Sequence, residues 1–296
     1  MQHRINPKVD CVFKALLGAE ENRALLIDFL NAMLIDTLPR PISAVRILDP
    51  YNPRETLEDK LTIVDVKARD AAGRVFQIEI QLSVYADLTA RMLYGWADLY
   101  RRQLRRGQDY SILKPTHAIW LLDQTLRDDT PAYAHRYRMR DDQGQDLVDH
   151  GGIWIYELNK FAVQQVETEQ ERWLKFFNEA ETLDDEKLPN WMQTPVMRQA
   201  MSTLTAFSEQ ERAYHQYQAR QEFWRQQRSI QQELEKERAA KESERQAKEA
   251  ALQAKEAALR ANEAALRANE AERQAKEAAL AEVARLQALL NQSGDA

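Results

Sequence analysis

Two pairs of polar side chains in the first third of the 296-residue chain have the types and the spacing that could do chemistry. Asp65 and Lys67 are two residues apart, as are Glu79 and Gln81, so each pair shares one face if its segment is a β-strand. Both segments are otherwise apolar, and two carboxylates beside a core need a compensating charge. Two interpretations stay open: Lys67 forms a salt bridge with the acids, or oxygens of Asp65 and Glu79 bind a divalent cation such as Mg²⁺.

The segments around these residues predict a β-hairpin. Leu61–Ala68 carries a β-branched run and Arg74–Leu82 alternates apolar with polar residues, and both patterns are typical of strands. The residues between them, Asp70–Gly73, are typical of a turn. Such a hairpin would bring the four polar side chains together on one face.

An α/β domain is predicted around this hairpin, because short apolar runs alternate with helical patterns up to Pro195. Further strands are predicted at Ala44–Leu48, Thr116–Leu122, Tyr133–Met139 and Gly152–Leu158. Helices are predicted over Val12–Leu38 with a break at Gly18, over Asp87–Arg106, over Lys160–Leu183 and after Pro195.

The last third of the chain has the composition of one or two very long helices. Val196 to Ser293 contains neither Gly nor Pro and is rich in Ala, Glu, Gln, Lys and Arg. Ser208 and Glu211 match a capping box, which predicts a helix start near Ser208. We expect three segments: a domain at 1–195, a helical continuation at 196–245, and a heptad-repeat helix with a short disordered end at 246–296.

Residues 246–280 repeat a seven-residue unit that begins as QAKEAAL. Three interpretations of this repeat stay open. It could form a thin Ala-lined coiled coil with leucine outside, or a contact along the leucine edge, and either would make a homo-oligomer. It could also be a solitary helix held by helix propensity and by pairs such as Glu256 with Arg260.

Composition limits the class of protein. Cys11 is the single cysteine, so a disulfide framework is excluded and a reducing compartment is expected. The net charge of −6 counts against a protein that holds nucleic acid by bulk electrostatics, although a local basic patch remains compatible with it. The first ten residues carry no apolar stretch of signal-peptide length, and no uncharged run approaches 18 residues. We therefore expect a cytoplasmic protein without a membrane partner.

The segment that carries the two acids resembles a known nuclease core. Leu61–Gln81 reads LTIVDVKARDAAGRVFQIEIQ and is similar to the core of the PD-(D/E)XK nucleases, in the form DV…D-x-x-G-x-x-x-x-IEIQ. Within that superfamily it most resembles the recombination-promoting nuclease and putative transposase family. The resemblance covers Asn6 to Arg228 and includes KVDCVFK at residues 8–14, Arg91 with Tyr94, Gly107 followed by Tyr110, and YELNKF at residues 156–161.

The resemblance implies a restriction-endonuclease-like mixed sheet flanked by helices, with the long helix as an extension. It implies an endonuclease that uses Mg²⁺, or another divalent cation such as Mn²⁺ or Ca²⁺, to hydrolyse phosphodiester bonds of double-stranded DNA. Such cleavage would promote recombination or transposition. Asp65 and Glu79 would hold the metal with the backbone carbonyl of Ile80.

The resemblance also assigns roles to three neighbours of the metal. Gln81 stands in the place of the superfamily lysine, and a glutamine there can form hydrogen bonds but supplies no charge. Lys67 is a candidate for the missing positive charge. Asp10 matches the family's N-terminal acid, which either reaches the metal through a water or serves as a helix-end residue.

Two groups of residues on the next predicted helix are candidates for DNA contact. Arg91 and Tyr94 could touch the phosphate backbone or could simply pack beside each other. The arginines of the cluster that follows, Arg101, Arg102, Arg105 and Arg106, could track DNA or could stabilise a solvated helix end. The alternative function is a catalytically weak DNA-binding or scaffold protein that self-associates through its C-terminal helix.

Overall fold

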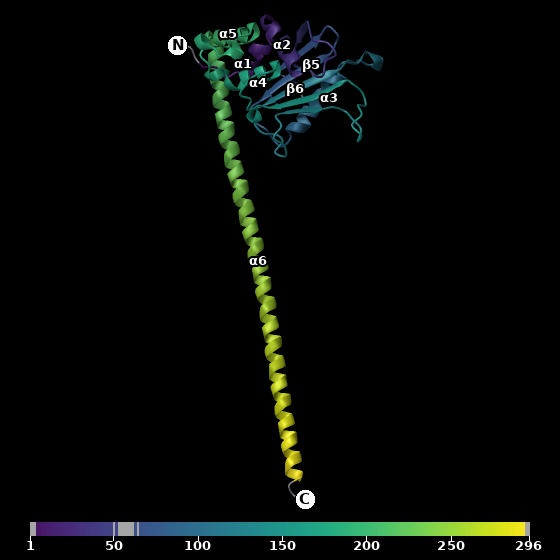
Figure 1. Ribbon diagram of the computed structural model, residues 1–296, viewed down its shortest axis with the longest axis vertical. Coiled ribbons are helices and arrows are strands. Elements are labelled where there is room, and N and C mark those ends of the chain that lie inside the picture. The colour runs from purple at the N-terminus through teal and green to yellow at the C-terminus, as the bar shows by residue number, and fades with distance from the viewer. Residues whose placement is uncertain (1–3, 50, 53–61, 64, 294–296) are drawn as a thin grey trace. The chain divides into compact units, whose positions relative to one another are not determined.

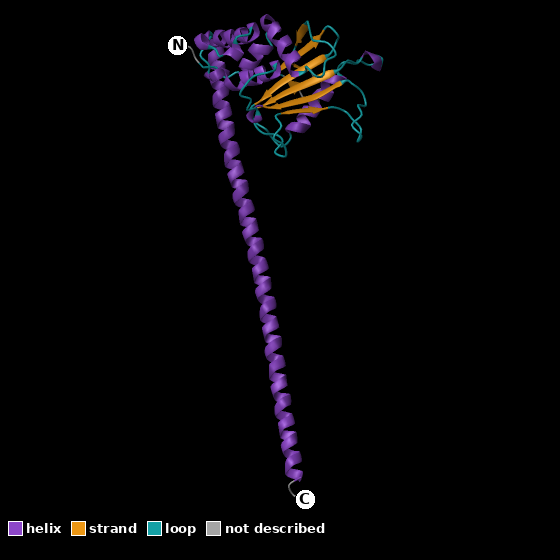
Figure 2. Ribbon diagram, in the orientation of Figure 1, coloured by secondary structure: helices purple, strands orange, loops and turns teal. Residues whose placement is uncertain are grey.

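The computed structural model describes residues 4–49, 51–52, 62–63 and 65–293. Its centre is a six-stranded sheet with the strand order β1-β4-β5-β6-β8-β7, flanked by helices (Figures 1 and 2). β5, β6 and β8 run parallel to one another. The pairs β1 with β4, β4 with β5, and β7 with β8 are antiparallel. The predicted mixed sheet with flanking helices is confirmed.

The strands of the large sheet are β1 (Val45–Leu48), β4 (Val66–Asp70), β5 (Val75–Gln81), β6 (Thr116–Leu122), β7 (Ala134–Tyr137) and β8 (Gly151–Glu157). A two-stranded sheet consists of β2 (Tyr51–Asn52) and β3 (Thr62–Ile63). The α-helices are α1 (Asp10–Leu17), α2 (Arg23–Met33), α3 (Leu88–Arg101), α4 (Glu169–Glu179), α5 (Pro195–Glu209) and α6 (Glu211–Ser293). Short 3₁₀ helices are η1 (Glu20–Asn22), η2 (Tyr110–Ile112), η3 (Leu158–Lys160), η4 (Ala180–Thr182), η5 (Asp185–Lys187) and η6 (Asn190–Met192).

The large sheet buries both of its faces, and each face meets different helices. Side chains alternate along β6, so Ile119 and Leu121 join the core formed with α1, α2, α4 and α5. Ala118, Trp120 and Leu122 join a smaller core under α3. Strands covered on both faces read as continuous apolar runs, which explains why β6 begins and ends as predicted.

The predicted hairpin is present, but its first strand begins later than expected. β4 and β5 pair from Val66 opposite Ile78 to Arg69 opposite Val75, and Gly73 closes the turn with a φ of 84°. Of the expected strand Leu61–Ala68, Thr62–Ile63 belong to the two-stranded sheet, whereas Leu61 and Val64 lie outside the described residues. Asp65 itself lies at a bend just before β4.

Two predicted helices are shorter than expected. The helix predicted over Lys160–Leu183 begins only at Glu169, because Thr168 and Glu171 form a capping box there. The helix predicted over Asp87–Arg106 ends at Arg101, so part of the arginine cluster lies on the turn that follows.

The Gly- and Pro-free region forms α5 and α6, separated at Gln210, which has an extended ψ of 105°. A helix begins close to Ser208, as predicted, but Ser208 itself belongs to α5. The Ser208 hydroxyl donates to the carbonyl of Thr205 in the last turn of α5, and α6 begins at Glu211.

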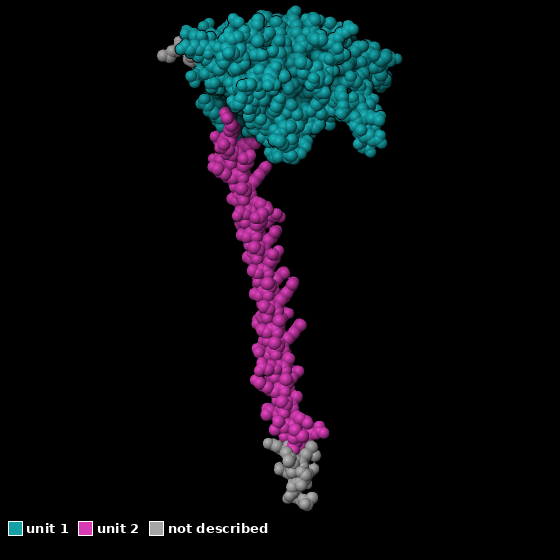
Figure 3. Space-filling model, in the orientation of Figure 1, with its two compact units in different colours: residues 1–227 teal, residues 228–296 magenta. Residues whose placement is uncertain are grey.

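The chain divides into two compact units, residues 1–227 and 228–296, with the division inside α6 (Figure 3). The first unit holds both sheets and helices α1 to α5. In the second unit the predicted pair of Glu256 and Arg260 is present at 3.9 Å, and Leu252 and Leu259 are more than half exposed. No helix in the described ranges is long and apolar enough to cross a membrane.

Candidate active site

The two acids singled out in the sequence are neighbours in space. Oδ2 of Asp65 accepts a hydrogen bond of 3.0 Å from the backbone amide of Ile80, the residue that follows Glu79. An amide of strand β5 thus donates to a side-chain oxygen of Asp65. The backbone pairing of β4 with β5 begins one residue later, at Val66. The bond therefore places the Asp65 carboxylate beside the strand that carries Glu79.

Glu79 lies in the middle of the sheet and is only 4% exposed. Burial, and secondly the charge of Asp65, raise its pKa to about 8. Burial also raises the pKa of Asp65, while the amide of Ile80 and the ammonium of Lys14 oppose that rise. Without a cation the two carboxylates thus disfavour being charged together, and a cation between them would remove this penalty.

Gln77 holds Glu79 in place, and the sequence interpretation missed it. Its Nε2 donates to Oε1 of Glu79 at 2.9 Å, and its side chain is fully covered. A Cβ added at Gly95 of α3 would come within 3.3 Å of that Nε2, so the glycine lets the helix approach Gln77 closely. The alternation of Gln77, Glu79 and Gln81 along one strand face was the signal available in the sequence.

Gln81, which the resemblance places at the superfamily's lysine position, also lies buried on this face. Its Nε2 donates to the hydroxyl of Tyr85 at 2.7 Å. The amide is therefore oriented by Tyr85, and a neutral group stands where a lysine would carry charge.

A cation that the sequence analysis did not name, Lys14, lies beside Asp65. Nζ of Lys14 lies 3.3 Å from Oδ1 of Asp65, and the lysine side chain is 39% exposed. Burial lowers the pKa of Lys67, and the nearby charges that act on it are, in order, Arg102, Asp49, Arg69 and Asp98. Lys67 thus shares the strand face with the acids but lies among a different set of charges.

Asp10, at the start of α1, lies close enough to raise the pKa of Asp65 by its charge. Its Oδ2 pairs with Arg220 of α6 at 3.4 Å, and its buried Oδ1 has no hydrogen-bond partner among the described residues. Asp10 is thus both the first residue of a helix and a neighbour of the acid pair.

Arg91 and Tyr94 are both exposed on α3. The guanidinium of Arg91 lies over the ring of Trp120 at 5.8 Å, and its charge lowers the pKa of Glu79. Arg91 therefore belongs to the surroundings of the acid pair.

The four arginines of the cluster differ in their pairing. Arg101 and Arg102 form ion pairs with Asp98, at 3.1 and 2.7 Å. Arg105 and Arg106 are exposed on the turn after α3. The charge of the first two is therefore shared with a carboxylate, and the last two present theirs to solvent.

The donor set at Asp65 and Glu79 fits a hard divalent cation. Among the residues that the structure describes, no three His, Cys, Asp or Glu side chains gather closely enough to hold a metal by themselves. Mg²⁺ commonly takes one or two protein carboxylates and completes its shell with water and substrate phosphate. Two carboxylates on neighbouring segments, both with raised pKa, match that pattern.

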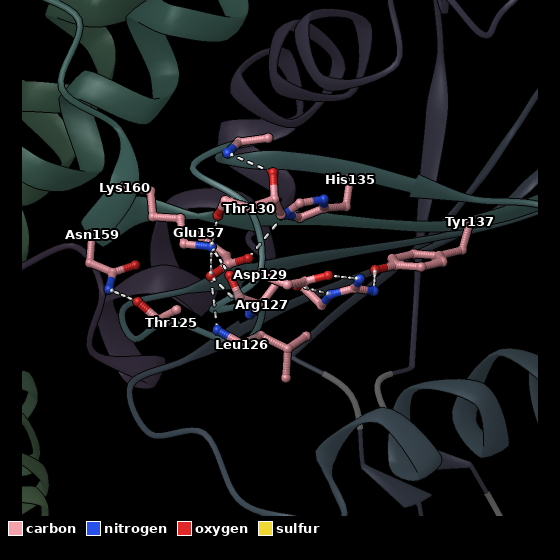
Figure 4. Close-up of polar contacts among 11 residues, drawn as sticks. Thr125, Leu126, Arg127, Asp129, Thr130, His135, Tyr137, Glu157, Asn159 and Lys160 are labelled. Carbon is pink, nitrogen blue, oxygen red and sulfur yellow. Dashed lines mark hydrogen bonds and ion pairs between the residues drawn. The ribbon is translucent and has the colours of Figure 1, made fainter.

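A second polar cluster lies at the end of β8 and is already neutralised (Figure 4). The buried carboxylate of Glu157 pairs with Lys160 and His135, each at 3.0 Å, and accepts the amide of Leu126 at 2.8 Å. Lys160 also donates to the carbonyls of Arg127 and Thr130. This cluster fixes the loop between β6 and β7 and needs no further cation.

Comparison with known proteins agrees with this architecture. A sequence model described as PD-(D/E)XK nuclease family transposase matches residues 7–234. Searches of curated proteins and of solved structures gave no match. The matched residues include the acid pair, Lys14 and all strands of the large sheet. The chain belongs to the PD-(D/E)XK nuclease family transposases.

Proposed function

We propose that the chain is an endonuclease that hydrolyses phosphodiester bonds of double-stranded DNA with the help of Mg²⁺ or another divalent cation. The observation that carries this proposal is the position of Asp65, just before β4, beside the strand β5 that carries Glu79, held by its hydrogen bond from the amide of Ile80. Two buried carboxylates with raised pKa supply the oxygen ligands for a cation. Family membership supports the same chemistry.

In this proposal Asp65, Glu79 and the carbonyl of Ile80 hold the cation. A bound divalent cation supplies a water of lowered pKa and polarises the phosphate, without a covalent intermediate. Gln77 orients the carboxylate of Glu79 through their 2.9 Å hydrogen bond. Gln81, held by Tyr85, contributes a neutral hydrogen-bonding group in place of a lysine.

The DNA would approach over the exposed side of α3. Arg91 stands beside the acid pair, and Tyr94 is 52% exposed on the same helix. Arg105 and Arg106 extend the basic surface, since their charges are not shared with Asp98 as those of Arg101 and Arg102 are. These residues would contact phosphates and position the duplex without reading its sequence.

DNA breaks made by such an enzyme would promote recombination between DNA segments in the cytoplasm. Transposition would require strand transfer in addition to cleavage, so we assign hydrolysis as the primary reaction.

Cleavage of supercoiled plasmid tests the proposal. The wild type should nick or linearise the plasmid with Mg²⁺, and Asp65→Asn should not, because it removes a ligand charge but keeps an oxygen for the Ile80 amide. Asp129→Asn, an exposed carboxylate paired with Arg127, is the matched control and should cleave like the wild type. Equal cleavage by Asp65→Asn and the wild type would exclude this site.

A second candidate function is a catalytically weak scaffold that binds DNA and self-associates through α6. It is favoured by the engagement of Gln81 with Tyr85 and by the exposed leucines of α6. Calorimetric titration with Mn²⁺ separates the two functions, because a scaffold without a working centre should bind no metal at Asp65.

A further inference from the structure

The cationic side chain that contacts the acid pair comes from α1, since Nζ of Lys14 lies 3.3 Å from Oδ1 of Asp65. Gln81 is neutral and bonded to Tyr85, and Lys67 lies among the charges of Arg102, Asp49, Arg69 and Asp98. Phosphodiester cleavage builds negative charge on the phosphate, and a fixed cation near it lowers the barrier. Lys14 of α1 is placed to supply such a charge, because it contacts Asp65.

We propose that Lys14 of α1 is the catalytic cation of this site, contacting the scissile phosphate in place of a lysine at position 81. Its Nζ is 3.3 Å from Oδ1 of Asp65, and its side chain is 39% exposed, whereas that of Asp65 is 13% exposed. The ammonium thus contacts a largely buried acid from a side chain that is partly open to solvent, so a phosphate could reach it. This inference rests on the proposed function.

The charge of Lys14 acts on both acids, since it lowers the pKa of Asp65 and that of Glu79. Two other basic side chains, Lys8 before α1 and Arg220 of α6, have carboxylate partners of their own. Lys8 pairs with Asp123 after β6, and Arg220 pairs with Asp10. Of these three basic residues, Lys14 is the one that forms an ion pair with Asp65.

The packing of α1 holds Lys14 at this position. Val12, Phe13, Leu16 and Leu17 are buried in the main core, so the opposite side of the helix is fixed. Gly18 ends α1, and its amide donates to the carbonyl of Lys14 at 2.8 Å. A Cβ at Gly18 would meet that carbonyl oxygen at 2.8 Å and Cγ2 of Val66 at 3.4 Å. The glycine therefore permits a close approach of α1 to the strand that follows Asp65.

The test compares Lys14→Met, Lys14→Arg and the matched control Lys8→Met in the full-length protein. Lys8→Met removes the same charge from the same segment, but its partner is Asp123. Single-turnover plasmid cleavage with saturating Mg²⁺ should fall about 100-fold in Lys14→Met, the cost of removing one group that stabilises transition-state charge. Lys14→Arg should retain most of the rate, and Lys8→Met should cleave like the wild type.

Metal binding measured without DNA distinguishes a catalytic role of Lys14 from a role in holding the two carboxylates in place. Lys14→Met should bind Mn²⁺ at least as tightly as the wild type by calorimetry, because a cation that competes for Asp65 has been removed. Loss of Mn²⁺ binding together with cleavage would overturn the inference, since Lys14 would then only hold the acids in place. A double variant, Lys14→Met with Gln81→Lys, should regain about tenfold of the lost rate if charge at the phosphate is what matters.

The outcomes also distinguish this inference from the proposed function. Undiminished cleavage by Lys14→Met, with an active wild type, would overturn the role of Lys14 and leave the nuclease intact. An inactive wild type that binds no Mn²⁺ would overturn the nuclease, and the role of Lys14 with it.

Discussion

The backbone amide of Ile80 donates to Oδ2 of Asp65 at 3.0 Å, and this bond ties the acid before β4 to the strand that carries Glu79. The strand therefore supplies one acid by its side chain and fixes the other by its backbone. Such an arrangement sets the relative position of the carboxylates before any cation binds, which reduces the reorganisation that binding requires.

Divalent metal should stabilise the protein through this pair. A ligand that binds only the folded state raises the melting temperature, by an amount that grows with its concentration relative to Kd. Calorimetric melting at pH 8 should therefore show a rise with Mg²⁺ or Mn²⁺ in the wild type. Glu79→Gln should show none, because it removes one of the two charges, and removal of the metal by chelation should reverse the rise in the wild type. An equal rise in both proteins would place the metal elsewhere.

Crowding Gln77 should impair the site without unfolding the protein. Gly95→Ala gains helix propensity worth about 1 kcal/mol, but its Cβ would lie 3.3 Å from Nε2 of Gln77. We expect a small change in stability by denaturant titration and a loss of cleavage of about tenfold, similar in size to one weakened hydrogen bond to a charged group. Gln77→Ala relieves the contact, so the effects of the two substitutions should not add. Additive losses would show that Gly95 acts independently of Gln77.

Several features of the fold follow directly from the sequence, and others depend on contacts between distant residues. The bounds of β6 could be predicted because its run of residues is mostly apolar and is buried on both faces. The turn after β4 could be predicted because Asp70 and Gly73 are typical turn residues, and Gly73 has a positive φ there. The two-residue period of strands predicts that Asp65 lies near Glu79, and the hydrogen bond from the Ile80 amide to Asp65 places the two residues on neighbouring segments, although Asp65 lies just before β4. Lys14 could not be placed in this way, because its contact with Asp65 depends on how α1 packs against β4.

The late start of α4 illustrates a different limit of sequence-based prediction. Apolar periodicity continues from Phe161, yet Lys160 binds carbonyls of the loop between β6 and β7, and the chain stays irregular until Thr168. The capping pair of Thr168 and Glu171 was readable in the sequence. Periodicity alone therefore overextended the helix where a local capping signal would have limited it.

Glu157 should matter for stability more than for catalysis. Its carboxylate is fully buried between Lys160 and His135, and removing one partner of a buried ion pair costs about 3 to 5 kcal/mol. We expect Glu157→Gln to lower the free energy of unfolding by an amount on this scale in urea titrations. Asp129→Asn, in the same loop but exposed, should change it little. Comparable stability of the two variants would show that the cluster does not fix the loop.

His117 should make the protein sensitive to acid. Burial, and secondly the charge of Arg74, lower its pKa to about 3, from 6.5 for a free histidine. Because the folded state holds the neutral ring, this contribution to stability is complete above about pH 6.5 and is lost as the pH falls toward 3. The loss amounts to about 1.4 kcal/mol for each pH unit below 6.5.

The substitution His117→Phe tests this directly, because the ring lies between Phe76 and Trp154 and both ring nitrogens lack hydrogen-bond partners in the described structure. A phenylalanine keeps the aromatic contacts and cannot be protonated. The difference in unfolding free energy between the wild type and the variant should therefore grow in favour of the variant between pH 6.5 and 4. A constant difference over that range would show that His117 is not the acid-sensitive group.

The leucines of α6 should decide whether the chain self-associates. Leu252, Leu259, Leu266 and Leu280 recur along the heptads and are each more than half exposed, so together they offer an apolar line to a second copy. If they pair, sedimentation should give a dimer or a higher oligomer for the wild type and a monomer after removal of residues 246–296. Replacing the four leucines with glutamine should have the same effect at full length, because it removes the apolar contact and keeps helix propensity. Plasmid cleavage should persist in both variants, since the acid pair lies in the unit of residues 1–227. A monomeric wild type would instead assign the repeat to a single helix, held by ion pairs such as that of Lys248 with Glu244.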